Sequence, residues 1–256
     1  MSTEPLQIAS RDNPLVRELR KLAQDNAAYR KLGQVWIEGD HLCRAALGRS
    51  WRPSTAVFGE TAWPRWRGEF AGIAGRDVIV ADKLLGEISS LESPASMGFL
   101  VDLPGAPAVI AGGAAVVLDR VQDAGNVGSI IRSAAAFGFE QVLAIKGTAA
   151  LWSPKVLRAG MGAHFGLRLV EGLAVEDIAG LGLEMLATSS HGGELLHRAA
   201  LPWPCAWLLG HEGQGVCAEL EALAQRRIRI AQPGGEESLN VAAAAAICLH
   251  ASGASR

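Results

Sequence analysis

Apolar and polar positions alternate in short blocks over the first hundred residues of the chain. Apolar side chains recur every three or four positions in residues 13–32, which predicts a helix that Asn13 caps and Pro14 begins. Apolar runs of strand length follow, and helix-like segments begin near Asp40 and Asp82. The strand candidates are residues 35–37, 55–58 and 78–80. Because predicted strands and helices alternate along the chain, the pattern of the first hundred residues predicts a small α/β domain.

The alternation restarts after residues 102–113, DLPGAPAVIAGG, a segment rich in Pro and Gly without Lys, Arg or Glu. We place a domain boundary there, which gives domains of residues 1–105 and 106–256. A β-branched run at 114–119 predicts the first buried strand of the second domain. Further strand candidates are 141–145, 167–170, 183–187, 206–209 and 227–230, and helix candidates lie near 127–137, 154–160, 174–181, 216–224 and 239–252. This order predicts a mostly parallel sheet with helices on both faces and a ligand site beyond the carboxyl ends of its strands.

Composition narrows the chemistry that the chain can perform. Of its 256 residues, 49% are hydrophobic and 20% are charged, and the net charge of -2 provides no global attraction for nucleic acid. A nucleic-acid partner would therefore be bound by a local patch. The four cysteines are widely spaced and the six histidines have no metal-site spacing, so we expect no disulfide framework, no metal and a cytoplasmic location. The N-terminus does not resemble a secretory signal, and no uncharged stretch reaches the ~20 apolar residues of a membrane span.

The polar face of the first predicted helix is basic. Such a face either contacts the phosphate backbone of a nucleic acid or is only solvated, and the sequence leaves both interpretations open. The basic residues are Arg17, Arg20, Lys21, Arg30 and Lys31.

Three loops that are rich in glycine and polar residues follow three predicted strands of the second domain. They are LDRVQDAGNVGSIIRSAAAFG at 118–138, LLGHEGQGV at 208–216 and IAQPGGEESLN at 230–240. Glycines let a backbone approach a ligand closely, and the carboxyl ends of parallel strands share one edge of a sheet. A dinucleotide fingerprint is absent, since Phe165 stands where GMGAHFG would need glycine. No GKS or GKT phosphate loop occurs and HEGQG lacks a second histidine, so hydride transfer, phosphoryl transfer and a zinc site are disfavoured.

The third loop leads into the strongest helix candidate in the chain. The PGG at 233–235 frees the backbone to take turn conformations, and Ser238 or Asn240 can cap the helix that follows. The alanine run at 242–246 combines high helix propensity with little bulk, so this helix can pack closely against another backbone.

Together the three loops resemble the motifs of SpoU-like (TrmH-type) SPOUT RNA methyltransferases. The resemblance rests on Asn126, Gly128 and Arg132 in N-x-G-x-x-x-R, on G-x-E-G-x-G at 210–215 and on SLNV at 238–241, and it covers about residues 114–252. SRDNPLVRELRKLA, VWIEGDHL and ISSLESPASMGFL are similar to the family's accessory RNA-binding domain of ribosomal-protein L30e-like type.

The resemblance implies transfer of a methyl group from S-adenosylmethionine to a ribose 2′-hydroxyl of RNA. Ribosomal RNA is the favoured substrate and transfer RNA the second choice. It also implies a homodimer and a deep trefoil knot in the C-terminal domain. The residues expected to be catalytic are Arg132, Asn126, Glu212, Ser238 and Asn240. The cofactor is expected to contact mainly backbone around Thr188, Leu209, Gly210, Gly215, Ile230 and Leu239. Because a guanidinium stays protonated, we expect Arg132 to grip phosphate and stabilise the developing alkoxide rather than act as a base.

Several roles have alternatives at this point. Asn126 either hydrogen-bonds the ribose, holds Arg132, or serves as a turn residue. Glu212 either pairs with an arginine, including one from a partner subunit, or is a helix-start carboxylate. Ser238 and Asn240 either touch substrate or cap the last helix, and Ala242 stands where many relatives have serine. A different class of function is a non-catalytic RNA-binding or assembly factor that keeps the cofactor pocket.

Overall fold

The computed structural model describes residues 4–235 and 238–254, and no helix in that part is long and apolar enough to cross a membrane. Contacts divide the chain into two compact units. The first comprises Met1–Gly105 and Trp152–Phe165, and the second comprises Ala106–Leu151 and Gly166–Arg256.

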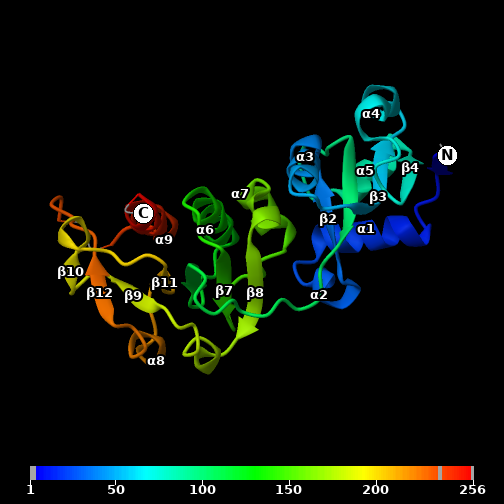
Figure 1. Cartoon of the computed structure of the whole chain (residues 1–256). Coiled ribbons are helices and arrows are strands. Elements are labelled where there is room, and N and C mark those ends of the chain that lie inside the picture. The colour runs from blue at the N-terminus through cyan, green and yellow to red at the C-terminus, as the bar shows by residue number, and fades with distance from the viewer. Residues whose placement is uncertain (1–3, 236–237, 255–256) are drawn as a thin grey trace. The chain divides into compact units, whose positions relative to one another are not determined.

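A five-stranded sheet in the order β1-β4-β3-β5-β2 forms the centre of the first unit (Figure 1). Its strands are β1 (Leu6–Ile8), β2 (Gln34–Glu38), β3 (Pro53–Gly59), β4 (Arg76–Val80) and β5 (Met97–Asp102). The sheet is mixed, because β5 runs antiparallel to both β2 and β3 while β1, β4 and β3 are parallel. Its helices are α1 (Pro14–Gln24), α2 (Ala28–Leu32), α3 (Asp40–Gly48), α4 (Trp63–Phe70), α5 (Asp82–Ile88) and α7 (Pro154–Gly160).

The helix expected over residues 13–32 is two helices. Its start is as predicted, because Pro14 begins α1 and the Asn13 side chain accepts a hydrogen bond from Leu15 N at 2.9 Å. The continuous span was wrong, because Asp25 is extended and its carboxylate accepts the N–H of Ala27 in a local turn. Short polar side chains compete with helix in this way.

The segment Trp152–Phe165 groups with the first unit, although we expected it in the second domain. Its aromatic rings explain the grouping. Trp51 contacts the rings of Trp152 and Phe165 with centroids 5.7 and 5.3 Å apart, and its indole N–H donates to the Phe165 carbonyl at 3.1 Å. These contacts join residues that lie far apart in sequence, so no local sequence pattern predicts them.

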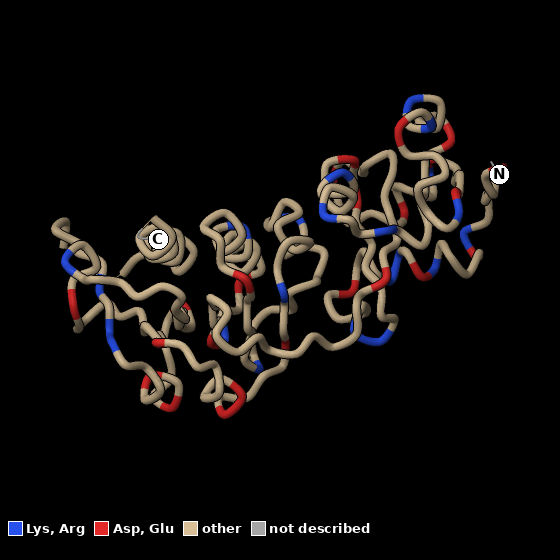
Figure 2. Tube along the Cα trace, in the orientation of Figure 1, with Lys and Arg blue, Asp and Glu red and all other residues tan. Residues whose placement is uncertain are grey.

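Arg20 and Arg44 of the first unit form ion pairs on its surface. Figure 2 shows acidic and basic residues together on α3 and α4, where Arg44 binds both Asp40 and Glu69. On α1 the guanidinium of Arg20 is held by Glu87 of α5 at 3.2 Å. Ion pairing thus accounts for much of the charge on these helices.

Seven parallel strands form the sheet of the second unit, in the order β10-β12-β9-β11-β6-β7-β8. They are β6 (Ala115–Leu118), β7 (Gln141–Ile145), β8 (Arg168–Leu173), β9 (Glu184–Ser189), β10 (Glu194–Leu195), β11 (Cys205–Leu209) and β12 (Arg226–Arg229). The prediction of a parallel sheet is confirmed. Its helices are α6 (Ala124–Ala136), α8 (Ala218–Glu221) and α9 (Val241–Gly253).

Two expected helices of this unit are much shorter than predicted. Residues 174–181 hold only the 3-10 turn Val175–Asp177, and 216–224 hold only the four-residue α8. In Figure 1, α6 and α9 lie on one face of the sheet and α8 on the other. The last helix is anchored from the core, since the fully buried Trp207 of β11 donates its indole N–H to Ser252 at 2.9 Å. The packing of α6 on α9 brings together the helix within the first loop and the helix after the third loop.

Candidate active site

The three polar loops start at the same edge of the seven-stranded sheet. Strands β6 and β11 are neighbours with Leu118 opposite Leu209, and the N–H of Asp119 continues the ladder by donating to the Leu209 carbonyl at 2.8 Å. The third loop follows β12 and ends in α9, which packs on α6. Parallel strand order therefore gathers segments that are more than a hundred residues apart in the chain.

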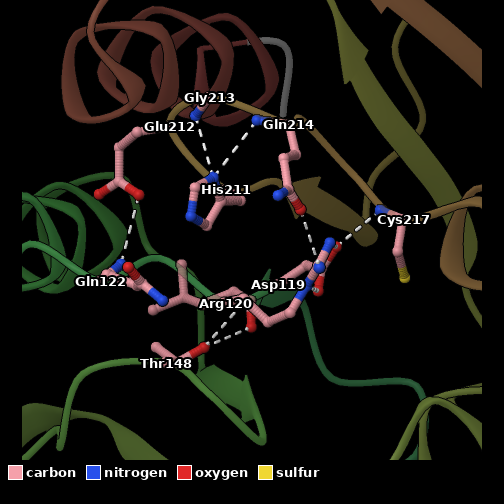
Figure 3. A network of polar contacts seen from close by, with 10 residues as sticks. Asp119, Arg120, Gln122, Thr148, His211, Glu212, Gly213, Gln214 and Cys217 are labelled. Carbon is pink, nitrogen blue, oxygen red and sulfur yellow. Dashed lines mark hydrogen bonds and ion pairs between the residues drawn. The ribbon is translucent and has the colours of Figure 1, made fainter.

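Glu212 in the second loop binds the start of α6 in the first loop. Its carboxylate accepts the backbone N–H of Gln122 at 3.3 Å (Figure 3), the backbone N–H of Asp123 at 3.2 Å and the side-chain amide of Asn126 at 3.2 Å. Burial raises the pKa of the Glu212 carboxyl, but hydrogen bonds from its own backbone N–H, from Asn126 and from the α6 start outweigh it. The pKa lies below its ordinary value. Glu212 thus binds the start of α6, and no ion pair joins it to an arginine of the described residues.

Asn240 performs two tasks at the start of α9. Its side-chain oxygen accepts the N–H groups of Ala242 and Ala243 at 2.9 and 3.2 Å, so it caps the helix as predicted. Its amide N–H donates to the Asn126 side-chain oxygen at 2.9 Å. Since Asn126 in turn donates to Glu212, a directed chain of hydrogen bonds runs from Asn240 through Asn126 to Glu212 and ties α6 to α9.

Arg132 lies further along α6, is exposed, and forms no hydrogen bond or ion pair with the residues that the structure describes. The interpretation that Asn126 holds Arg132 was wrong. At 3.6 residues per turn, positions six apart point about 120° away from each other, and the Asn126 amide is occupied by Glu212 and Asn240. The guanidinium is thus available to a ligand. Ser238 is also exposed, and it forms no hydrogen bond within the described part of the chain.

The residues expected around the cofactor lie at the carboxyl ends of neighbouring strands β9, β11 and β12, or in the loops that follow. The residue at 210 must be glycine, because a β-carbon there would overlap the backbone of Gly215 and Val216. Gly215 itself has φ +71°, and it closes a small hairpin with His211 through two backbone hydrogen bonds of 2.8 and 3.0 Å. This tight approach puts backbone rather than side chains at the surface of the loop.

The four other residues of the expected cofactor set differ in their surroundings. Leu209 is fully buried, whereas the side chain of Leu239 is 39% exposed at the start of α9. Thr188 donates its hydroxyl to the Leu208 carbonyl at 3.0 Å and lies opposite Ile228 of β12 in the sheet. Ile230 follows the last residue of β12.

The end of β12 holds buried polar atoms that lack partners. Arg229 Nε and Gln232 Oε1, on either side of Ile230, have no hydrogen-bond partner among the described residues. Buried polar groups are nearly always satisfied, so unpaired ones beside a glycine-rich loop fit a polar ligand that carries donors and acceptors. A nucleoside-containing cofactor has such groups. No cluster of His, Cys, Asp or Glu in the described residues is placed to hold a metal ion.

Sequence reasoning missed the residues that brace the second loop. His211 Nδ1 accepts the backbone N–H groups of Gly213 and Gln214 at 3.0 and 3.3 Å, which shapes the turn around Glu212. Asp119, directly after β6, is fully buried. Burial raises the pKa of the Asp119 carboxyl, but hydrogen bonds from Arg120 and from the Cys217 N–H lower this pKa by more. The pKa of Asp119 therefore lies below its ordinary value. A carboxylate at the end of an otherwise apolar strand was the available signal.

The sheet is all-parallel, and its carboxyl edge carries three glycine-rich loops that are held by hydrogen bonds. These features are typical of α/β enzymes with a ligand site at that edge of the sheet. The comparison with known families identifies the member. The chain belongs to the SpoU rRNA Methylase family, whose sequence model matches residues 113–250. It is therefore an RNA methyltransferase of that family.

Relatives of similar length support this assignment. An uncharacterized tRNA/rRNA methyltransferase of Synechocystis is 30% identical, with 98% of this chain and 94% of the relative aligned. The Bacillus subtilis 23S rRNA (guanosine(2553)-2'-O)-methyltransferase RlmP is 29% identical over 95% of this chain and 98% of its own. The AdoMet-bound structure of an rRNA methyltransferase from Sinorhizobium meliloti superposes with a TM-score of 0.83 at 26% identity, covering 98% of both chains. The likeness thus extends over both units.

Proposed function

We propose that this chain methylates a ribose 2′-hydroxyl of ribosomal RNA, with S-adenosylmethionine as methyl donor. The observation that carries the proposal is the chain of hydrogen bonds from Asn240 through Asn126 to Glu212, which joins all three family motifs beside the unpaired Arg132. The full-length similarity to a 2′-O-methyltransferase of 23S rRNA supports both the ribose and the class of RNA.

In this reaction the 2′-oxygen forms a bond to the methyl carbon while the carbon–sulfur bond breaks, and its electron pair stays on sulfur. S-adenosylmethionine supplies a sulfonium that departs as a neutral thioether, so the leaving group needs no protonation. The task of this chain is to align the hydroxyl and to stabilise the charge that develops on its oxygen. Arg132 stays protonated and would grip an RNA phosphate beside that oxygen, while the proton leaves to phosphate or water.

The remaining residues of the site act as a frame for the two substrates. Asn126, Glu212 and Asn240 would fix the starts of α6 and α9, and Ser238 would contact RNA from the third loop. The cofactor would lie against backbone near Thr188, Leu209, Gly210, Gly215, Ile230 and Leu239. The orphaned polar atoms of Arg229 and Gln232 support a ligand there.

The proposal includes the architecture that the family resemblance implies. Residues 106–256 would form a SPOUT domain with a deep trefoil knot, and residues 1–105 an L30e-like RNA-binding domain. The exposed Arg17 and Lys21 on α1 support an RNA-facing surface there. A homodimer is supported by Ile247 of α9, an apolar side chain that is 42% exposed in the single chain. The buried thiols of Cys43, Cys205 and Cys248 suit the reducing cytoplasm.

The decisive experiment measures transfer of labelled methyl from S-adenosylmethionine to unmodified ribosomal RNA and transfer RNA, with the product mapped by nuclease digestion. We expect label in a 2′-O-methyl nucleotide of ribosomal RNA. Arg132→Ala should lower kcat by about 100- to 1000-fold, the effect of losing one group that stabilises a developing oxyanion, with cofactor affinity unchanged. Arg168→Ala is the matched control, because Arg168 is exposed and its guanidinium donates to the Ala108 carbonyl at 3.0 Å, away from the three loops.

Three outcomes would contradict the proposal or one of its parts. Label in a base rather than a ribose would show a different acceptor. Cofactor binding without transfer to either RNA would favour the RNA-binding assembly factor. Loss of cofactor affinity in Arg132→Ala would mean that the arginine is structural.

A further inference from the structure

Arg120 has an unusual backbone conformation at the site. It follows the buried Asp119 and has φ +57°, in the left-handed region that L-residues other than Asn and Asp rarely adopt. Such a conformation is strained for an L-residue with a β-carbon, and it persists where the surroundings over-determine it. The contacts of this residue show what holds it there.

The side chain of Arg120 joins the first loop to the second. Its Nε and Nη2 donate to the two oxygens of Asp119 at 2.8 and 3.2 Å, and its Nη1 donates to the side-chain oxygen of Gln214 at 3.2 Å (Figure 3). The forked contact with a buried carboxylate fixes the plane of the guanidinium. One N–H is thereby aimed at the second loop.

The loop after β7 also contacts Arg120. Its backbone N–H donates to the Thr148 hydroxyl at 3.1 Å, and that hydroxyl donates to the Leu118 carbonyl at 3.0 Å. Gly147, with φ +96°, leaves room for the methylenes of Arg120, since a β-carbon there would lie 3.1 Å from Arg120 Cγ. Three loops therefore meet at this one residue.

Asp119 holds the far end of the same second loop. Its Oδ2 accepts the N–H of Cys217 at 2.6 Å. The second loop is thus fastened at Gln214 by Arg120 and at Cys217 by Asp119, while Glu212 between them reaches the start of α6. A loop fastened at these points keeps the backbone of Gly210 and Gly215 in one position.

We propose that Arg120 is a positioning residue for methyl transfer, which fixes the loop of residues 210–217 through Gln214 and does not itself touch RNA. This inference rests on the proposed function, because it assigns that loop to the cofactor site. The competing outcome is direct contact of Arg120 with RNA phosphate, since its side chain is 33% exposed.

Cofactor affinity of the RNA-free protein, measured by calorimetry, tests the inference. Gln214→Met removes only the acceptor and leaves the Arg120–Asp119 pair intact, so it should fold. We expect it to raise Kd for S-adenosylmethionine about three- to tenfold, the weight of one hydrogen bond. Gln214→Glu should restore wild-type affinity, because a carboxylate accepts the same N–H. Arg120→Met should weaken binding at least as much, and adding Gln214→Met to it should have no further effect.

The two substrates separate positioning from direct RNA contact. Under the proposal, KM for RNA changes in none of these variants. A raised KM for RNA in Arg120→Met with unchanged cofactor Kd would overturn the inference, as would additive effects of Arg120→Met and Gln214→Met. These results are distinct from failure of the proposed function, in which the wild-type protein labels no ribose whatever its cofactor affinity.

Discussion

The two sheets of this chain are surrounded by charged residues that are used in different ways. In the first unit, Arg20 pairs with Glu87 of α5, and Arg44 pairs with Asp40 of its own helix and with Glu69 of α4. In the second unit, Arg226 and Arg227 also form ion pairs, but Glu212 accepts N–H groups from another loop and Arg132 has no partner among the described residues. Matched charges hold helices together, whereas the unmatched arginine is available to an anionic ligand.

Strand direction explains why the second unit collects a site. All seven of its strands are parallel, so every strand-to-helix loop leaves from the same edge. In the first sheet β5 runs against both of its neighbours, so its loops are divided between two edges. Chemistry assembled from distant segments therefore depends on the parallel sheet.

The largest expected effect comes from the tightest backbone approach in the second unit. Gly210→Ala would place a β-carbon into the backbone of Gly215 and Val216. Overpacking of this kind costs about 1–3 kcal/mol, so we expect cofactor affinity to fall by up to about 100-fold as the loop moves. Gly180→Ala is the control, since a β-carbon at Gly180 meets no atom within 4 Å. Equal losses in both variants would show that the close approach is irrelevant to binding.

A smaller effect distinguishes capping from the link between motifs. Asn240→Asp keeps an oxygen for the N–H groups of Ala242 and Ala243, but it cannot donate to the Asn126 oxygen. We expect methyl transfer to fall by up to about tenfold, the weight of one hydrogen bond that positions two motifs. Thermal unfolding should change less than in Asn240→Ala, which loses the cap and about 1 kcal/mol. Full activity of Asn240→Asp would show that the link is dispensable.

Local patterns predicted the strands of the second sheet well. The β-branched run at 141–145 matches β7 in both bounds, and the polar residue before the alanine run caps α9. Contacts between distant residues were not predictable in this way. The aromatic cluster of Trp51 with Trp152 and Phe165 assigns one segment to the first unit.

Short polar residues and strained backbone also escaped the patterns. The turn at Asp25 ends α1 although the apolar period continues, because a side chain competes for the backbone there. The left-handed conformation of Arg120 is accompanied by contacts of its side chain with Asp119, Gln214 and Gly147. The sequence around Arg120 does not predict these contacts. Sites that depend on such convergence become visible only in the folded chain.

The smallest expected effect tests the first unit. Its basic helix α1 carries both exposed basic side chains and one that is held in an ion pair. Arg17 and Lys21 are exposed, whereas Arg20 is engaged by Glu87. If α1 faces RNA, replacing Arg17 and Lys21 together by Met should weaken RNA binding a few-fold and leave cofactor affinity unchanged. The slope of log K against log salt should become shallower by about 0.7 for each phosphate contact removed. Arg20→Met should leave that slope unchanged because its charge is already paired, and the same unchanged slope in the double variant would mean that the face is only solvated.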